Sequence, residues 1–531
     1  MENTSNRKLM LVNSIFTIVL RVLGLVLIFP LALILTNETL ILLLVVFLQY
    51  IVVFRIILMG IPSGFKELTS RAYEAKDFKA EIKLFVISLI FTLILSIGGF
   101  FIIRNSHVII RYESIIDDLI RINKLLSISI IVSAVLSIFK AFLRPRLGEY
   151  YTLGNVIYRG LIILSVIIAI FFSISTKMTS GSLVYIIGIG LLSSSSIVLC
   201  YFGYHFYKLI TDIKYSYDYE NKDTAVKVFQ LLIYLFKYSL PYVMMFAALP
   251  LYRLFDIYLL QSIITPKMDA IIETARYQFN VYYLLALFSV IVTITASVYI
   301  GRVGADFSVN NLSGVDKNIN KSLQYVLYFT LPLAAYLMMF SDQVYGIIFS
   351  NTSVLTYAAP IVILIPLFII TSRLVNIINK SAYLWYSILF GLLVKVFTTY
   401  ALSIYLGING AVIATHIGLL STIVINLVVL KTVTLFDLNF FVKRLGYLLL
   451  ITGITFGLLY VIDILFASTL DYSISILNNL LYILITFVIT IVLYFVMSLY
   501  SGLFRIVGEA DITIYDVYDQ IEEWEDDELL W

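Results

Sequence analysis

The chain has 531 residues, of which 61% are hydrophobic and only 13% charged, and its formal net charge is +3. Soluble proteins carry about 25% charged residues, so this composition excludes an ordinary soluble domain. The apolar residues form blocks of about 20, the length that crosses the hydrocarbon core of a bilayer, and this indicates a polytopic membrane protein.

Fourteen apolar spans of helical length follow one another along the chain. Because only helices satisfy their own backbone hydrogen bonds in lipid at this span length, an all-α fold is predicted. The first span starts at Leu9 and is too long for the core of a cleaved signal peptide. The spans are expected at 9–36, 39–61, 84–103, 125–143, 153–174, 183–206, 231–252, 281–300, 323–340, 357–375, 384–405, 409–430, 445–466 and 475–497.

Lysine and arginine are distributed unevenly among the connections. Most lie in the amino end, in the loops after even-numbered spans and at the start of the tail, and far fewer lie in the loops after odd-numbered spans. The positive-inside rule then places both termini in the cytoplasm. The exception is 104–124, an outward loop in which basic and acidic residues occur together. The other long outward loop is expected at 253–280.

The longest inward connection predicts a division of the chain. Residues 208–230 are charged and polar and read as a cytoplasmic linker between two six-helix halves. We expect an N-terminal lobe (1–207), a C-terminal lobe (231–432), a last helix pair (433–500) and an acidic cytoplasmic tail (501–531). Paired prolines, Pro241 with Pro250 and Pro360 with Pro366, predict bends in the seventh and tenth helices, either as a gate or as ordinary kinks.

The tail carries an apolar stripe at helical spacing and many carboxylates. The stripe predicts a short helix that rests on the protein's own cytoplasmic face, with docking of a cytoplasmic partner as the alternative. Binding to anionic lipid is disfavoured because the tail is negatively charged. The stripe comprises Ile514, Val517, Tyr518, Ile521 and Trp524.

No residue pattern of an enzyme is present. The single cysteine, Cys200, excludes an internal disulfide, and the distant histidines His107, His205 and His416 predict packing or interfacial roles rather than a metal site. Glycine-rich phosphate loops, nucleophile elbows and HExxH zinc motifs are missing from the sequence. We expect no cofactor and no nucleic-acid partner, and coupling to membrane potential, H⁺ or Na⁺ stays open.

Charged residues within the spans are the informative feature, because each costs about 2.5–3.5 kcal/mol at mid-helix on insertion scales. Cations dominate, and Asp256 lies three residues from Arg253, where the two could neutralise one another. For Arg159 and Lys237, near helix ends, snorkelling to the headgroups is favoured. Lys395 could bind substrate or hold a neighbouring helix. The candidate substrate-binding residues are Arg21, Arg55, Arg253, Asp256, Arg276 and Lys395.

Three of these cations, Arg21, Arg55 and Arg276, have no carboxylate partner within the spans. A guanidinium is always charged and grips phosphate oxygens two at a time. A set of arginines around a cavity therefore indicates an anionic substrate, most economically a phosphate or a diphosphate. A cation antiporter would need buried carboxylates in the first lobe, and the first six spans have none.

Several stretches, in order, resemble lipid-linked glycan flippases of the MurJ/SpoVB type, in the multidrug/oligosaccharidyl-lipid/polysaccharide (MOP) exporter superfamily. The resemblance covers the first twelve spans, and the number of later spans agrees. The stretches that carry it are "RVLGLVLIFPLALIL" from Arg21, "RIILMGIPSGFKELTSRAYEAKDF" from Arg55, "FKAFLRPRLGEYYTLGNVIYRG", "SLPYVMMFAALPLYRLFDIYLL", "ETARYQFNVYYLLALFSVIVTI" and "LFGLLVKVFTTYALSIYLGINGAVIATHIG".

The resemblance implies two pseudo-symmetric six-helix lobes in a V around a cationic cavity, with the last two helices forming a groove for a lipid tail. It implies a flippase of the cytoplasmic membrane that moves a polyprenyl-diphosphate-linked glycan by alternating access in cell-wall biosynthesis. By motif position, Arg21, Arg55 and Arg276 become candidate ligands of the diphosphate or headgroup.

The sequence departs from that pattern at two places. Leu27 stands where many members have a second basic residue, and "LRPRLGE" replaces a glycine-rich loop. Lipid II is therefore the leading substrate, with a teichoic, capsular or other envelope oligosaccharide carrier as the alternative. A multidrug antiporter of the same superfamily is the alternative of another class. A membrane glycosyltransferase or polymerase is disfavoured because it would need an aqueous acidic or histidine site on a large outer loop, and the sequence shows no such site.

Overall fold

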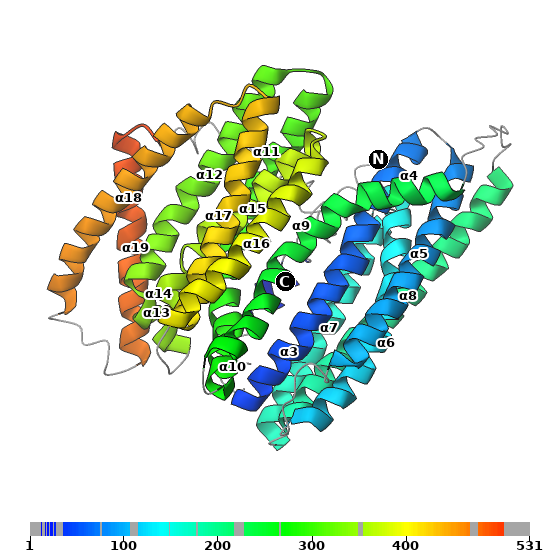
Figure 1. The fold of residues 1–531 in the computed structure, drawn as a ribbon, viewed down its shortest axis with the longest axis horizontal. Helices are drawn as coiled ribbons and strands as arrows, with labels where there is room; N and C mark the ends of the chain where they lie inside the picture. Colours follow the sequence, from blue (N-terminus) through cyan, green and yellow to red (C-terminus); the bar gives the residue numbers. More distant parts are fainter. Residues whose placement is uncertain are drawn as a thin grey trace. The chain divides into compact units, whose positions relative to one another are not determined.

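A computed structural model gives the fold (Figure 1). It describes residues 36–74, 77–106, 115–147, 149–176, 179–216, 228–264, 267–348, 354–467 and 476–503, together with isolated positions between 12 and 27. Regular structure in these ranges is helical throughout, which confirms the all-α prediction. The predicted first span, apart from those positions, and the tail after residue 503 lie outside the described residues.

Thirteen helices in the described part of the chain are long and apolar enough to cross a membrane. They correspond to the second to fourteenth predicted spans. Capping side chains fix where several begin: the Thr36 hydroxyl accepts from the Thr39 backbone N–H at 3.3 Å, and Asp77 Oδ1 accepts from the Ala80 N–H at 3.0 Å. Such caps satisfy backbone donors that have no partner within the helix.

Contacts divide the chain into two compact units, which meet in sequence between Leu254 and Phe255, within one helix. The first unit contains α3 (Asn37–Phe54), the π-helical turn η1 (Arg55–Gly60), α4 (Ile61–Glu74), α5 (Phe78–Arg104), α6 (Ile116–Leu147), α7 (Glu149–Thr176), α8 (Ser180–Ser216) and the first part of α9 (Val228–Ile263).

The second unit contains the end of α9 and the helices that follow it. These are α10 (Lys267–Arg276), the π-helical turn η4 (Tyr277–Val281), α11 (Tyr282–Ser308), α12 (Leu312–Met339), α13 (Ser341–Ile348), α14 (Leu355–Ala358), α15 (Ile361–Ile377), α16 (Ser381–Leu406), α17 (Ile408–Val433), α18 (Leu438–Ala467) and α19 (Ile476–Tyr500).

Several predicted boundaries differ from the structure because helices continue beyond the apolar spans. Residues 208–216 of the expected linker belong to α8, and 228–230 belong to α9. The expected outward loop at 253–280 is mostly helical, since α9 runs to Ile263 and α10 leads through η4 into α11. The prediction that Pro360 bends the tenth helix from within is wrong, because Pro360 precedes α15 as its N-cap residue.

Aromatic packing forms the core of the first unit. Phe85, Phe142 and Phe206 pack together with ring centroids 4.8–5.6 Å apart, and Phe65 is fully buried in the same cluster. The segment "LRPRLGE" contributes Arg146, which forms an ion pair with the buried Glu81. That pair links α5 to the end of α6.

Two glycines let α4 and η1 approach the first part of α9 closely. A Cβ atom on Gly60 would lie 2.6 Å from the Cα of Val243, and one on Gly64 would lie 2.6 Å from the Cα of Ser239. The Ser239 hydroxyl donates to the Ile61 carbonyl at 3.2 Å across this seam. Only a residue without a side chain fits at either position.

The last span of the second unit, α19, attaches to α12 through tyrosines. The Tyr336 hydroxyl donates to the Ile483 carbonyl at 2.9 Å, and the Tyr494 hydroxyl donates to the Tyr328 carbonyl at 3.0 Å. Only 28% and 22% of the residues in the most apolar windows of α18 and α19 are buried. These helices therefore present wide apolar faces, as lipid contact requires.

Candidate functional site

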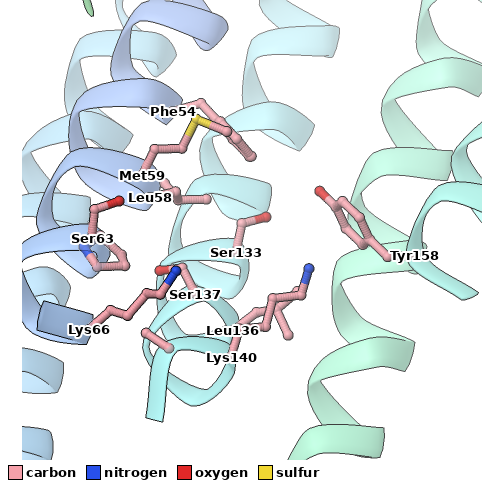
Figure 2. A pocket seen from close by; sticks show the side chains of 12 residues that line it. Phe54, Leu58, Met59, Ser63, Lys66, Ser133, Leu136, Ser137, Lys140 and Tyr158 are labelled. Atoms are coloured by element: carbon pink, nitrogen blue, oxygen red, sulfur yellow. The ribbon is translucent and has the colours of Figure 1, made fainter. Parts of the chain in front are cut away.

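A partly open cavity lies within the first unit. Its twelve lining side chains come from α3, η1, α4, α6 and α7 (Figure 2). The polar members are Ser63, Lys66, Ser133, Ser137, Lys140 and Tyr158; the others are Phe54, Leu58, Met59, Pro62, Leu136 and Ala141.

The lining carries positive charge and hydroxyl groups but no carboxylate. The ammonium groups of Lys66 and Lys140 point into the same space, and the Tyr158 hydroxyl faces them from α7 (Figure 2). Lys140 Nζ also lies 4.7 Å from the centroid of the Tyr158 ring, within cation–π range. The arrangement suits an anionic group with an aliphatic part beside it.

A π-helical turn positions one wall of this cavity. The span Asn37–Glu74 is continuous, but η1 changes its register between Arg55 and Gly60. Pro62 follows at once, and its lack of a backbone N–H removes one regular hydrogen bond of the α-helix. Such turns occur often at functional sites.

Arg55 opens that π-helical turn and is only 3% exposed. It is not among the residues that line the cavity of Figure 2. Arg276 has a similar place in the second unit, since it ends α10 directly before the π-helical turn η4. Arg21 lies outside the described residues.

The expectation that Arg276 has no partner is wrong. Its Nη1 donates to Glu273 Oε1 at 3.0 Å, one turn earlier on α10. Glu273 lies just before the predicted span 281–300, outside the apolar block, and was therefore not among the predicted charges of the spans. Burial raises the pKa of Tyr345; the positive charge of Arg276 lowers it, and the negative charge of Glu273 raises it. A small polar cluster of Glu273, Arg276, Asn280 and Tyr345 therefore forms in the second unit.

Asp256 and Lys395 form a fully buried ion pair between α9 and α16. Their side chains are 2% and 0% exposed, and Thr399 Oγ1 lies 3.4 Å from Lys395 Nζ. The sequence suggested Arg253 as the partner of Asp256 and did not predict Lys395. This geometry matches the alternative in which Lys395 holds a neighbouring helix. Arg253 is 7% exposed and belongs to the first unit.

Lys66 and Lys140 were not predicted as site residues, because both lie near the ends of predicted spans and belong to the cations of the inward connections. A repeated pattern could have found them, because "SGFK" on α4 and "SIFK" on α6 share Ser-x-Phe-Lys. Among the described residues, no group of three or more His, Cys, Asp or Glu could hold a metal ion. His205 packs against Tyr150 and Tyr201, in line with its predicted packing role.

An all-α fold with thirteen long apolar helices among the described residues defines a multi-pass membrane protein. No family model matches the chain. The structure resembles that of the lipid II flippase MurJ in an inward closed conformation, with a TM-score of 0.64 and 18% identity, over 93% of this chain and 99% of that one.

A MATE multidrug transporter of the MOP superfamily in its inward-facing conformation also matches, with a TM-score of 0.60 and 15% identity over 82% of this chain and 98% of that one. In sequence, the chain is 20% identical over 433 residues to the lipid II flippase MurJ of Bacillus subtilis (strain 168), covering 76% of this chain and 79% of the relative. The chain thus has the fold of MOP-superfamily transporters, and the resemblance to MurJ-type proteins is confirmed.

Proposed function

We propose that the chain is a flippase that moves a polyprenyl-diphosphate-linked glycan precursor, lipid II in the leading case, across the cytoplasmic membrane. The observation that carries this proposal is the similarity to a curated lipid II flippase over three quarters of the chain, together with the shared fold. The proposed mechanism is alternating access, in which the substrate site faces first one side of the membrane and then the other.

The cations support a substrate that carries phosphate. Arg55 and Arg276 each adjoin a π-helical turn, one in each unit. In this proposal both guanidinium groups contact the diphosphate or the headgroup, and Arg21 joins them from the first span. Guanidinium groups hold phosphate oxygens with paired, charge-assisted hydrogen bonds.

A multidrug and cation antiporter is the second candidate, because MATE transporters share the fold. Proton or sodium exchange needs a buried carboxylate that can change its partner. The buried carboxylates of the described residues are Glu81 and Asp256, and each already forms an ion pair with a protein cation. This observation favours the flippase over the antiporter.

Reconstituted vesicles test the proposal. Full-length protein in proteoliposomes should move fluorescent lipid II between leaflets, and expression should restore growth to a strain depleted of its own flippase. Movement of a teichoic or capsular lipid carrier but not of lipid II would assign the alternative glycan. Failure with every lipid-linked glycan, together with extrusion of cationic drugs, would contradict the flippase and support the antiporter.

A further inference from the structure

The polar cluster of the second unit combines groups that a site for phosphate alone would not need. Glu273, Arg276 and Asn280 follow one another at spacings of three and four residues along α10 and η4, so their side chains share one face of the helix. Tyr345 comes from α13, and its hydroxyl accepts a hydrogen bond from Asn280 Nδ2 at 3.5 Å. One cation, one carboxylate, one amide and one phenol therefore lie together.

The side-chain carbonyl of Asn280 is the unusual member of this cluster. The residue is only 8% exposed, and its Oδ1 atom is buried with no hydrogen-bond donor among the described residues. Buried polar atoms are normally paired, and leaving one without a partner costs about 1–3 kcal/mol. A ligand that donates a hydrogen bond to Asn280 Oδ1 would remove that cost.

The chemistry of the cluster distinguishes between the two parts of a lipid-linked glycan. An ionised phosphate only accepts hydrogen bonds, so it cannot pair with Asn280 Oδ1. The carboxylate of Glu273 would also repel a phosphate, and its ion pair with Arg276, at 3.0 Å, offsets the positive charge there. The hydroxyl and amide groups of a glycan both donate and accept, and they match a site of mixed donors and acceptors.

The helix that carries Tyr345 is anchored at two points. Asn479 Nδ2 of α19 donates to the Gln343 carbonyl at 3.0 Å, and the Thr356 hydroxyl donates to the Ser341 hydroxyl at 2.6 Å. On the other side of the cluster, all five residues of the π-helical turn η4 are buried. The fold therefore holds both the amide and the phenol in place, as a site that distinguishes ligands requires.

The charged pair is the accessible part of the cluster. The side chains of Arg276 and Glu273 are 28% and 42% exposed, whereas Asn280 lies one turn further along the helix and is buried. A ligand that approaches from the side of the pair reaches the guanidinium and the carboxylate first and the amide after them.

We propose that Asn280 and Tyr345, beside the Glu273–Arg276 pair, form a binding site for the glycan of the lipid-linked substrate. This site rests on the proposed function and assigns Arg276 to the glycan rather than to the diphosphate. Asn280 Oδ1 accepts a hydrogen bond from a hydroxyl or amide group of the glycan, and the Tyr345 hydroxyl holds the amide of Asn280 in position.

Binding to the full-length protein in lipid nanodiscs, followed by native mass spectrometry, tests the site. The probes are lipid II, a teichoic lipid carrier and the polyprenyl diphosphate that lacks a glycan. The glycan contribution is the dissociation constant of the glycan-free lipid divided by that of the glycan-bearing lipid. Asn280→Leu and Tyr345→Phe should each lower this ratio about tenfold, the loss expected for a buried hydrogen bond. Binding of the glycan-free lipid should not change.

The stability of the ligand-free protein gives a second readout. Asn280→Leu replaces an amide whose oxygen has no partner, so the thermal unfolding midpoint should stay the same or rise. A structural role for Asn280 would instead lower it. The matched controls are Asn439→Leu and Tyr383→Phe, which make the same changes at exposed positions of the same unit and should leave every affinity unaltered.

Three outcomes would overturn the site. An unchanged ratio in both Asn280→Leu and Tyr345→Phe would show that neither residue contacts the glycan. Equal weakening of the glycan-free and glycan-bearing lipids by Tyr345→Phe, which removes a single oxygen atom, would assign the cluster to the diphosphate. A ratio near one in the unaltered protein, for lipid II and the teichoic carrier alike, would show that the glycan is not bound.

Transport separates this site from the proposed function. If the unaltered protein moves lipid II in proteoliposomes and both variants keep the full ratio, the glycan site is wrong and the flippase assignment stands. If the unaltered protein binds the glycan and both variants lose that binding, while no lipid-linked glycan is moved, the site stands and the flippase assignment fails.

Discussion

Asp256 and Lys395 show what a buried charge needs inside a membrane protein. Each side chain has lost almost all contact with solvent, and their mutual attraction offsets that loss. Removing one partner leaves the other charge uncompensated, at a cost of about 3–5 kcal/mol. Asp256→Asn or Lys395→Met should therefore lower the thermal unfolding midpoint of the purified protein and its abundance in the membrane.

The double variant is the informative control for this pair. Asp256→Asn combined with Lys395→Met removes both charges together, so its stability should lie closer to the unaltered protein than that of either single variant. Additive losses in the double variant would show that the two residues do not stabilise each other.

Arg55 and Arg276 carry the second prediction at this scale. Arg55→Ala and Arg276→Ala should each abolish transport of lipid II while leaving the protein in the membrane. Lysine should restore little activity, because an ammonium cannot form the paired contacts of a guanidinium. Membrane abundance and complementation of a flippase-depleted strain provide the measurements.

Glu273 supplies the matched variant, since it pairs with Arg276. Glu273→Gln should retain transport if Arg276 serves the substrate, because the guanidinium stays in place. Loss of transport in Glu273→Gln and Arg276→Ala alike would point to the pair as a structural contact. Full activity in Arg55→Ala and Arg276→Ala would contradict the role of both arginines.

The sequence identified the cations of the spans but not all of their partners. Lys395 is 139 residues from Asp256 in the chain, and no local pattern relates two residues so far apart. Glu273 was not predicted as the partner of Arg276, because it lies outside the apolar block. Lys66 and Lys140 were hidden for a different reason, since position near a helix end does not reveal whether a lysine points to solvent or into a cavity.

At the scale of helices, Gly60 and Gly64 govern how closely α4 approaches α9 within the first unit. Gly64→Ala adds a Cβ within 2.6 Å of the Ser239 backbone and should destabilise the protein by about 1–3 kcal/mol, the usual cost of overpacking. Gly203→Ala meets nothing within 4 Å and should be neutral or stabilising by up to about 1 kcal/mol, since alanine favours a helix. The thermal unfolding midpoints of the two variants in detergent provide the comparison. A shift of the same sign in both would contradict the close contact of α4 with α9 at Gly64.

Helix positions followed from the sequence far better than helix ends did. Hydropathy identifies only the part of a helix that lies in hydrocarbon. Helices of this fold continue beyond that part, so hydropathy does not locate their ends. The segment 208–216 is polar yet extends α8, and 267–276 is polar yet forms α10. The π-helical turns were not predictable, because hydrophobic periodicity does not distinguish a π-helical turn from an α-helix.

For the whole molecule, the charge distribution predicts that both termini are cytoplasmic. The native Cys200 is exposed, so the test starts from Cys200→Ser. Cysteines introduced by Ser5→Cys and Glu528→Cys should resist an impermeant thiol reagent in intact cells. Thr179→Cys, in a short connection predicted to face outward, should react. Labelling of Ser5→Cys and Glu528→Cys from outside would show that both termini face outward and would contradict the predicted topology and direction of transport.

Helix α9 has a consequence for any attempt to split or recombine this protein. The charged connection before Val228 looks like the natural place for a cut, but contacts assign residues up to Leu254 to the first unit. A fragment that begins at Val228 would carry away the helical segment that seats against Gly60 and Gly64. Two co-expressed halves would have to rebuild that seam without a covalent link, and a chimera joined there would need α4 and α9 from the same parent.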